Sequence, residues 1–359
     1  MTDCRSTMLT DLQTRAAAAG VPVLDLIMIT ANMYGINDTG EIPRARMALS
    51  PHDQNETWQL ILPLNNPASP FTLRGDQLLL EGESVAALMA LENDDVVLTY
   101  LRAAGRSVTL NTYSRSSCIG CIFCPNIIED AADATVNGVD GLRRVLDWLC
   151  ADQQWPDLTA VEVITVCSGC FRTPAAAIRH MADLRRAAEP LGFDGRLHLL
   201  SSVLRDKDDL DRLAAEAGSA HLTLTLECFE RRPELLKSSK ASLGLDRSCE
   251  ILADCADLGI LGDFTYVAGL DPLASAVAGI RQLVAVATTF PRIQVYQAHN
   301  ELMRQYRSAD AGEIGYYIDL RREIEGDLQG RGLEPRSWEN YRPLWYTGFA
   351  GRPVPGPRI

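Results

Sequence analysis

The chain has 359 residues, of which 47% are apolar and 23% charged, so it can build one large α/β domain or two smaller ones. Its formal net charge is −13 and no basic run exceeds a pair of arginines, so nucleic acid is not an expected partner. We find no secretory leader and no apolar stretch of the roughly 18 to 20 residues that a membrane span requires, and therefore expect a cytoplasmic protein with no membrane partner.

The first 104 residues are predicted to form an α+β extension. The expected elements are a helix over 8–19 that ends at Gly20, a strand within 57–64, two short strands about Gly75, a short helix over 83–91, and two strands within 95–101 and 106–113. The last of these strands leads directly into a stretch with three cysteines.

From residue 105 to residue 330 apolar strands alternate with amphipathic helices. The expected strands are 108–113, 160–166, 196–202, 221–227, 263–269 and 293–298; the expected helices are 138–152, 174–188, 206–217, 245–258, 273–288 and 310–328. Thr173 and Pro174 form a typical helix start. Six βα units in a row predict a parallel sheet, either open or curled toward a barrel. The remaining tail, 331–359, is rich in Pro and Gly and is expected to run irregularly over the surface or across the mouth of the fold.

The segment "SSCIGCIFCPN" places Cys118, Cys121 and Cys124 directly after the first of these strands. Three thiolates cannot complete a tetrahedral zinc site, which would need a fourth ligand such as Cys167, Cys170 or a distant histidine. The alternative is a [4Fe–4S] cluster with three cysteine ligands, in which one iron stays open to a substrate or cosubstrate. The carboxyl end of a parallel strand is where such folds carry their chemistry, and this position favours the cluster.

At these residues the chain resembles the radical S-adenosylmethionine (radical SAM) superfamily, whose usual motif is CxxxCxxC with an aromatic residue before the third cysteine. Cys121, Phe123 and Cys124 match its second half, while the first gap is one residue short because Ser117 stands where the first cysteine is expected. The resemblance implies a partial (β/α)6 barrel over 105–330 that holds a [4Fe–4S] cluster. It further implies that SAM, bound at the open iron, is cleaved to a 5′-deoxyadenosyl radical that abstracts hydrogen from a small polar substrate, after an external donor such as flavodoxin or ferredoxin reduces the cluster.

The same resemblance implies which residues bind SAM. Ser168 and Gly169 of "CSGC" stand where the family binds the amino group of SAM, although the usual glutamate is missing. Glu227 ends the fourth strand and would reach the ribose or the methionyl group; it shares a face with Thr223 and Thr225. The alternative role of Glu227 is an ion pair with Arg231 or Arg232.

Further cofactor contacts are implied at the later strands. The cofactor-binding candidates there are Arg231 after the fourth strand, Val267 and Gly269 in the fifth, and Tyr296 and Gln297 at the end of the sixth. Cys170 is a candidate catalytic residue because it could donate a hydrogen atom, and His299 is a candidate base. Cys249 and Cys255 lie on apolar helix stripes and are predicted to be structural core residues.

The substrate is predicted to be a small molecule, an amino acid, sugar or nucleoside, with a carboxylate or phosphate. Polar and cationic residues cluster near the strand ends: Ser201, Ser202, Arg205, Arg231, Lys237, Lys240, Tyr296, Gln297, His299 and Asn300. Arg231 or Arg205 is the expected partner of the anionic group. The competing interpretation is a zinc-binding or non-catalytic α/β protein in which the cysteines are structural.

Overall fold

A computed structural model describes residues 7–38, 42–52, 56–64, 66–94, 99–112, 120–124, 136–167, 170–337, 339 and 342–355. The chain divides into two compact units. The first unit consists of Met1–Asp95, Val267–Ala278 and Arg292–Ile359, and the second unit consists of Val96–Tyr266 and Gly279–Pro291. Among the described residues, no helix combines the length and the apolar character needed to cross a membrane.

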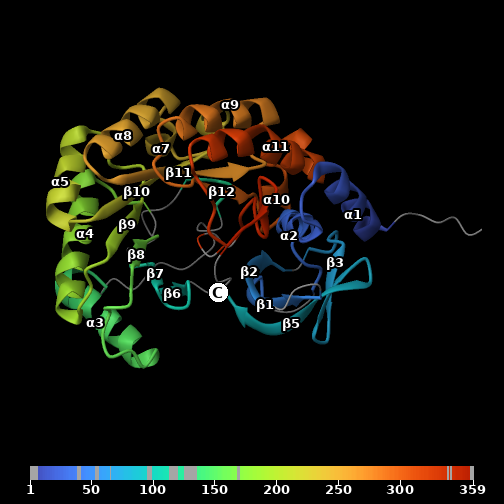
Figure 1. Ribbon diagram of the computed structural model, residues 1–359, viewed down its shortest axis with the longest axis horizontal. Helices are drawn as coiled ribbons and strands as arrows, with labels where there is room; N and C mark the ends of the chain where they lie inside the picture. The colour runs from blue at the N-terminus through green and yellow to red at the C-terminus, as the bar shows by residue number, and fades with distance from the viewer. Residues whose placement is uncertain are drawn as a thin grey trace, which may run out of the picture. The chain divides into compact units, whose positions relative to one another are not determined.

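The second unit is built on a sheet whose strands follow one another in chain order. The order is β11-β10-β9-β8-β7-β6, with β6 at Thr99–Arg102, β7 at Ser107–Leu110, β8 at Val163–Val166, β9 at Arg196–Leu200, β10 at Ala220–Glu227 and β11 at Leu261–Ala268. Strands β7 to β11 are parallel, and β6 joins β7 as an antiparallel hairpin. The sheet is curled (Figure 1), which agrees with a mixed α/β fold of partial-barrel type.

Helices occupy the connections between these strands, as the alternation predicts. They are α3 (Gly138–Asp152), α4 (Pro174–Ala188), α5 (Lys207–Ala217) and α8 (Leu245–Asp257), with the short helices η3 (Glu189–Leu191), α6 (Arg232–Leu235) and α7 (Ser238–Ala241). Figure 1 shows α3, α4, α5 and α8 on the outer side of the curled sheet. The predicted start of α4 is confirmed, because the Thr173 side chain accepts a hydrogen bond from the Ala176 N–H and Pro174 occupies the first turn.

Side chains of neighbouring strands in this sheet form a buried polar network. His198 lies between two hydroxyls, with Nδ1 at 3.1 Å from Thr165 Oγ1 and Nε2 at 2.7 Å from Thr223 Oγ1. Its ring stacks on that of His221 at 3.9 Å, and His221 Nε2 lies 2.9 Å from Asp263 Oδ2. A layer of this kind replaces the branched apolar residues that fill the interior of a closed barrel.

A third buried histidine, His180 of α4, makes the stability of the protein sensitive to acid. Its Nε2 lies 2.8 Å from Thr112 Oγ1, and burial lowers the pKa of His180 to about 4 from an ordinary value of 6.5. Between these two values the unfolded chain binds a proton that the folded chain does not, so stability falls as the pH falls through this range. The contribution reaches about 3 kcal/mol once the pH is below 4.

We therefore expect His180→Gln to flatten the loss of stability between pH 6.5 and pH 4. Urea unfolding at several pH values, with wild type and variant side by side, measures the difference. If both proteins lose stability with the same slope over this range, His180 does not carry the effect.

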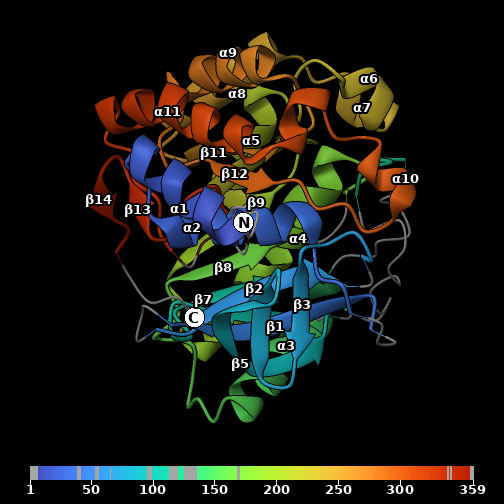
Figure 2. The same ribbon diagram turned by 90° about the vertical axis from the view of Figure 1, so that its right-hand side faces the viewer.

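The first unit combines an antiparallel sheet with helices from both ends of the chain. The sheet order is β2-β1-β5-β4-β3, with β1 at Arg44–Pro51, β2 at Trp58–Pro63, β3 at Phe71–Arg74, β4 at Gln77–Leu80 and β5 at Glu83–Asn93. The other elements of this unit are α1 (Met8–Ala19), α2 (Val23–Tyr34), the start of α9 (Leu273–Val284), β12 (Arg292–Val295), α10 (Glu301–Arg304), η4 (Ala309–Gly312), α11 (Ile314–Gly330), β13 (Gly348–Phe349) and β14 (Arg352–Pro353). Figure 2 views the five-stranded sheet with α1 and α2.

Several expectations for this unit are corrected. The stretch 83–91 is not a helix but most of strand β5, which pairs with β1 on one side and β4 on the other. Hydrogen bonding on both edges outweighs the local helix preference of its Ala and Leu residues. Helix α2 and strand β1 are not predicted by the sequence pattern.

The C-terminal tail is also different from what its composition suggests. Instead of lying on the surface, it buries Leu344, Trp345, Tyr346 and Phe349 within the first unit. The Leu344 N–H donates to the carbonyl of Ile293 in β12, so the tail is anchored to a strand. The aromatic residues provide the apolar area that the Pro and Gly residues lack.

Candidate functional site

The candidate site lies at the carboxyl edge of the parallel strands of the second unit. Residues 120–124 follow β7, Cys170 follows β8, and Glu227 ends β10. Since parallel strands end at the same edge, the fold brings these distant residues to one region. Three predicted site residues, Cys118, Ser168 and Gly169, lie outside the described residues.

The second half of the cysteine motif forms a turn that contacts α6 and the residue that precedes α7. The Cys124 N–H donates to the Cys121 carbonyl at 3.2 Å, and the Ile122 N–H donates to the Leu235 carbonyl at 3.0 Å. Gly120 has φ +100°, and a Cβ at this position would lie 3.0 Å from Lys237 Cβ. Glycine is needed here because the backbone is left-handed and close to its neighbour.

A buried lysine places a positive charge beside the thiols. Lys240 Nζ lies 2.7 Å from Glu227 Oε1, and only 8% of its side chain is exposed. Burial alone would lower the pKa of Lys240, but Glu227 and the thiols of Cys121 and Cys170 raise it above its ordinary value. Lys240 is therefore expected to carry its positive charge at neutral pH.

The same surroundings act on the Cys121 thiol. Burial raises its pKa, and the Lys240 charge and a hydrogen bond from the Lys237 backbone partly oppose this shift. Glu227 and Cys170 raise the pKa further by adding negative charge nearby. Cys121, Cys170, Glu227 and Lys240 thus form one electrostatic cluster.

The backbone conformation at the end of β10 places Glu227 in this cluster. Glu227 has φ 72°, a left-handed conformation that is uncommon for a residue with a side chain. The buried Arg232 fixes the turn by donating to the carbonyls of Leu226 at 2.6 Å, Cys228 at 2.7 Å and Lys240 at 2.7 Å. The ion-pair partner of Glu227 is Lys240, whereas the sequence suggested Arg231 or Arg232.

The two arginines expected to bind an anionic substrate both have partners in the fold. Arg205 donates from Nε to the Ser202 carbonyl at 3.1 Å and from Nη1 to Ser242 Oγ at 3.0 Å. Arg231 pairs with Glu234, with Nε 2.9 Å from Oε2. Arg205 thereby ties the end of β9 to the segment that carries Lys240, which gives it a positioning role.

In the first unit, three predicted SAM contacts are packed residues. Val267 is buried, and Gly269 has φ +108° with Tyr317 Oη 2.8 Å from where a Cβ would lie. The Tyr296 side chain is fully buried, and its hydroxyl donates to the Met303 carbonyl at 2.8 Å.

Gln297 is likewise held by its neighbours in the first unit. Its Nε2 donates to Asn32 Oδ1 at 2.6 Å and to the Ile61 carbonyl at 2.7 Å. His299, two residues after Gln297, is half-buried as a whole. Its Nε2 atom is buried and has no hydrogen-bond partner among the described residues.

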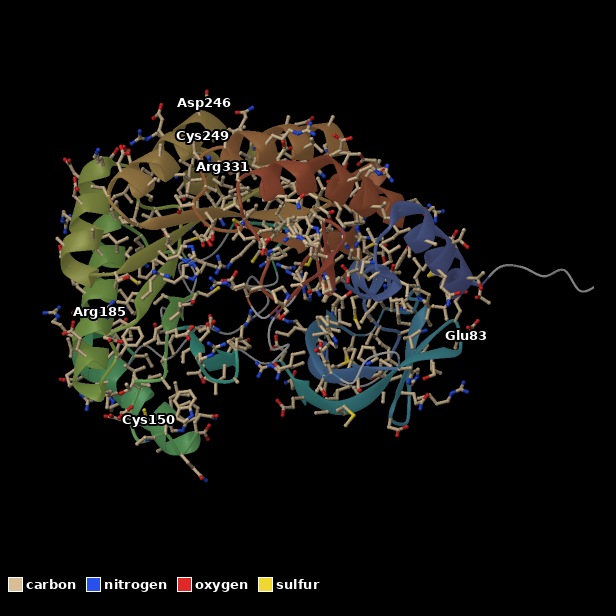
Figure 3. All side chains as sticks on the ribbon, viewed as in Figure 1. Glu83, Cys150, Arg185, Asp246, Cys249 and Arg331 are labelled. Atoms are coloured by element: carbon tan, nitrogen blue, oxygen red, sulfur yellow. The ribbon has the colours of Figure 1, made fainter. Side chains whose placement is uncertain are left out.

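The remaining cysteines differ in exposure. Cys255 is fully buried, which raises its pKa to about 12 and agrees with a core role. Cys249 is half-exposed on the outer helix α8 (Figure 3), so it is not the core residue that its apolar stripe suggests. Cys167 is exposed and Cys170 half-buried.

The side chains that could ligate a metal at this site are cysteine thiols. Within the part of the chain that the structure describes, no three His, Cys, Asp or Glu side chains are placed to hold a metal ion together. Cys121 and Cys124 are two donors on one anchored turn, and the third thiol of the motif, Cys118, precedes the described segment. Thiolates suit an iron–sulfur cluster, and the Lys240 charge suits the net negative charge that such a cluster has with three thiolate ligands.

Comparison with known proteins gives no family. A scan against protein-family models finds no match, and a search of curated proteins finds none either.

Proposed function

We propose that this protein is a radical SAM enzyme that holds a [4Fe–4S] cluster through Cys118, Cys121 and Cys124. The observation that carries the proposal is the anchored turn of Cys121 and Cys124 beside buried Lys240, at the carboxyl edge of a parallel sheet. When bound, the cluster would supply the electron that cleaves SAM and so generates the radical that abstracts hydrogen from a substrate.

The residues of this chain would contribute position and charge. The hydrogen bond from the Ile122 N–H to the Leu235 carbonyl of α6, with the bond from Cys124 to Cys121 inside the turn, would hold two thiols in place before a cluster binds and so lower the ordering cost of ligation. Lys240 would offset negative charge at the thiolates, and Glu227 would hold Lys240 in place.

We also propose roles for individual residues, a barrel fold, a substrate class and an electron donor. SAM would contact residues at the ends of the strands: Ser168, Gly169, Glu227, Arg231, Val267, Gly269, Tyr296 and Gln297. The fold would be a partial (β/α)6 barrel over 105–330, with 1–104 as an extension and 331–359 as a cap. The substrate would be a small anionic molecule, with Cys170 or His299 as a catalytic group, and flavodoxin or ferredoxin would be the electron donor.

A zinc site is the second candidate, and one observation favours it. Cys170 is close enough to Cys121 to raise the pKa of its thiol, so Cys170 could be a fourth thiol beside the three of the motif. Four thiolates are a typical structural zinc site.

Reconstitution with iron and sulfide separates the two candidates. The proposal expects a brown protein with [4Fe–4S] absorption and four irons per chain, as an Fe₄S₄ cluster requires. Cys118→Ala, Cys121→Ala and Cys124→Ala should each abolish the cluster, whereas Cys170→Ala and Cys249→Ala should retain it. Cys249 is a matched control because it lies on the outer helix α8.

Two results would contradict the proposal. One is a colourless protein that retains stoichiometric zinc and loses it in Cys170→Ala. The other is a Cys118→Ala protein that still assembles the full cluster.

A further inference from the structure

Two cysteines of the second unit stand three positions apart at the end of β8. Cys167 directly follows that strand, and Cys170 comes before helix α4. Neither thiol is part of a disulfide in the structure. Thiol–disulfide oxidoreductases use this C-x-x-C spacing, because it lets one thiol displace a group that is bound to the other.

The exposure of the thiols separates this pair from the other cysteines. Cys167 is exposed and Cys170 is half-buried, whereas Cys255 is fully buried. Cys121 and Cys124 have the same C-x-x-C spacing, but the first of them is buried. An attacking thiolate must reach the disulfide that it attacks. Among the described cysteines, Cys167 is therefore the one that a molecule in solution reaches most directly.

The backbone of Cys167 is held by the sheet. Its N–H donates to the carbonyl of Leu110, the last residue of β7, at 3.0 Å. This bond continues the parallel pairing of β7 and β8, in which Leu110 lies opposite Val166. The exposed thiol therefore extends from backbone whose position the sheet determines.

The chain after Cys170 is anchored to the same end of β7. Phe171 is buried, and its ring lies 5.5 Å from the ring of His180 in α4. His180 Nε2 lies 2.8 Å from Oγ1 of Thr112, which is two residues beyond Leu110 in the chain. Both flanks of the cysteine pair thus meet the end of one strand. This arrangement raises the effective concentration of one thiol at the other.

We propose that Cys167 and Cys170 form a redox-active dithiol whose partner is a low-molecular-weight disulfide such as oxidised glutathione. The Cys167 thiolate attacks one sulfur of the partner disulfide, and a mixed disulfide forms while the first partner thiolate leaves. The Cys170 thiolate then attacks Cys167 Sγ and displaces the second partner thiolate. Two electrons and two protons pass from the protein thiols to the partner, which becomes two thiols, and the protein gains one disulfide.

The dithiol is separate from the cluster that we propose, because its reaction needs neither iron nor SAM. It also differs from hydrogen-atom donation by Cys170 and from a zinc site that includes Cys170, since neither of these uses Cys167.

The test uses the metal-free, fully reduced full chain with oxidised glutathione as the probe. After the reaction is stopped with an alkylating agent in denaturant, trypsin cleavage at Arg144 and Arg172 releases one peptide with Cys150, Cys167 and Cys170. We expect mass spectrometry to find a disulfide between Cys167 and Cys170, and an alkylated Cys150, which is buried in the folded chain. Dithiothreitol should restore both thiols.

Cys170→Ala should accumulate the mixed disulfide of Cys167 with glutathione to a level about tenfold or more above that of the wild type, because no second thiol resolves it. Cys249→Ala is the matched control, since Cys249 has the same intermediate exposure but lies on α8. It should behave as the wild type does. If Cys170→Ala does not fold, Cys170→Ser carries the same test.

Three results would overturn the proposal. Glutathione could leave Cys167 unmodified in both the wild type and Cys170→Ala. The wild type could accumulate as much mixed disulfide as Cys170→Ala does. Cys170 could pair with Cys121 in place of Cys167. Since the test contains no iron, failed cluster reconstitution leaves the dithiol standing, and the reverse also holds.

Discussion

Asp25→Ala is expected to lower the free energy of unfolding by about 3–5 kcal/mol, the usual cost of removing one partner of a buried ion pair. The Asp25 carboxylate is fully buried in α2 and lies 2.7 Å from Arg321 Nη1. It also accepts from Thr347, at 2.7 Å from the backbone N–H and 2.6 Å from Oγ1. Without it, the buried Arg321 loses one of its two carboxylate partners and keeps Glu325, while Thr347 of the tail loses its acceptor.

Urea unfolding at neutral pH measures this effect, and Asp319→Ala is its control. Asp319 pairs with Arg322 on the surface of α11, so its loss should cost less than about 1 kcal/mol. A loss of stability in Asp25→Ala no greater than that in Asp319→Ala would mean that the tail is not held by this carboxylate.

The second large effect is expected at the pair of Lys240 and Glu227. Lys240→Met should lower the free energy of unfolding by about 3 kcal/mol, because the mostly buried Glu227 carboxylate loses its counter-charge. Glu227→Gln should have a similar cost, since it leaves the buried ammonium group uncompensated. The double variant should recover stability, because it removes both charges, with a coupling energy of about 1–3 kcal/mol.

Unfolding of the iron-free protein gives the four values of this double-mutant cycle. Lys237→Met is the matched control: it changes a lysine of the same segment but retains the backbone N–H that bonds to the Cys121 thiol. Strictly additive losses in the double variant would show that Lys240 and Glu227 do not stabilise each other. Iron content after reconstitution should fall in Lys240→Met and not in Lys237→Met, if Lys240 supports the thiolates.

The alternation of strands and helices after residue 105 was determined by the sequence alone. Apolar periodicity predicts the strands β7 to β12 and the long helices α3, α4, α5, α8, α9 and α11, but not the short helices between them. Local signals such as Thr173 and Gly20 mark helix ends correctly, with Gly20 in a left-handed C-cap of α1. These features depend on residues within one or two turns of one another, so a single sequence contains the information.

Only the tertiary structure decided the elements and contacts that depend on distant partners. The stretch 83–91 became strand β5 because β1 and β4 pair with it, although its own residues suit a helix. Lys240 lies 13 residues from Glu227, and Arg321 lies 296 residues from Asp25. A local pattern carries no record of such pairs, because burial and charge complementarity arise only when the chain has folded.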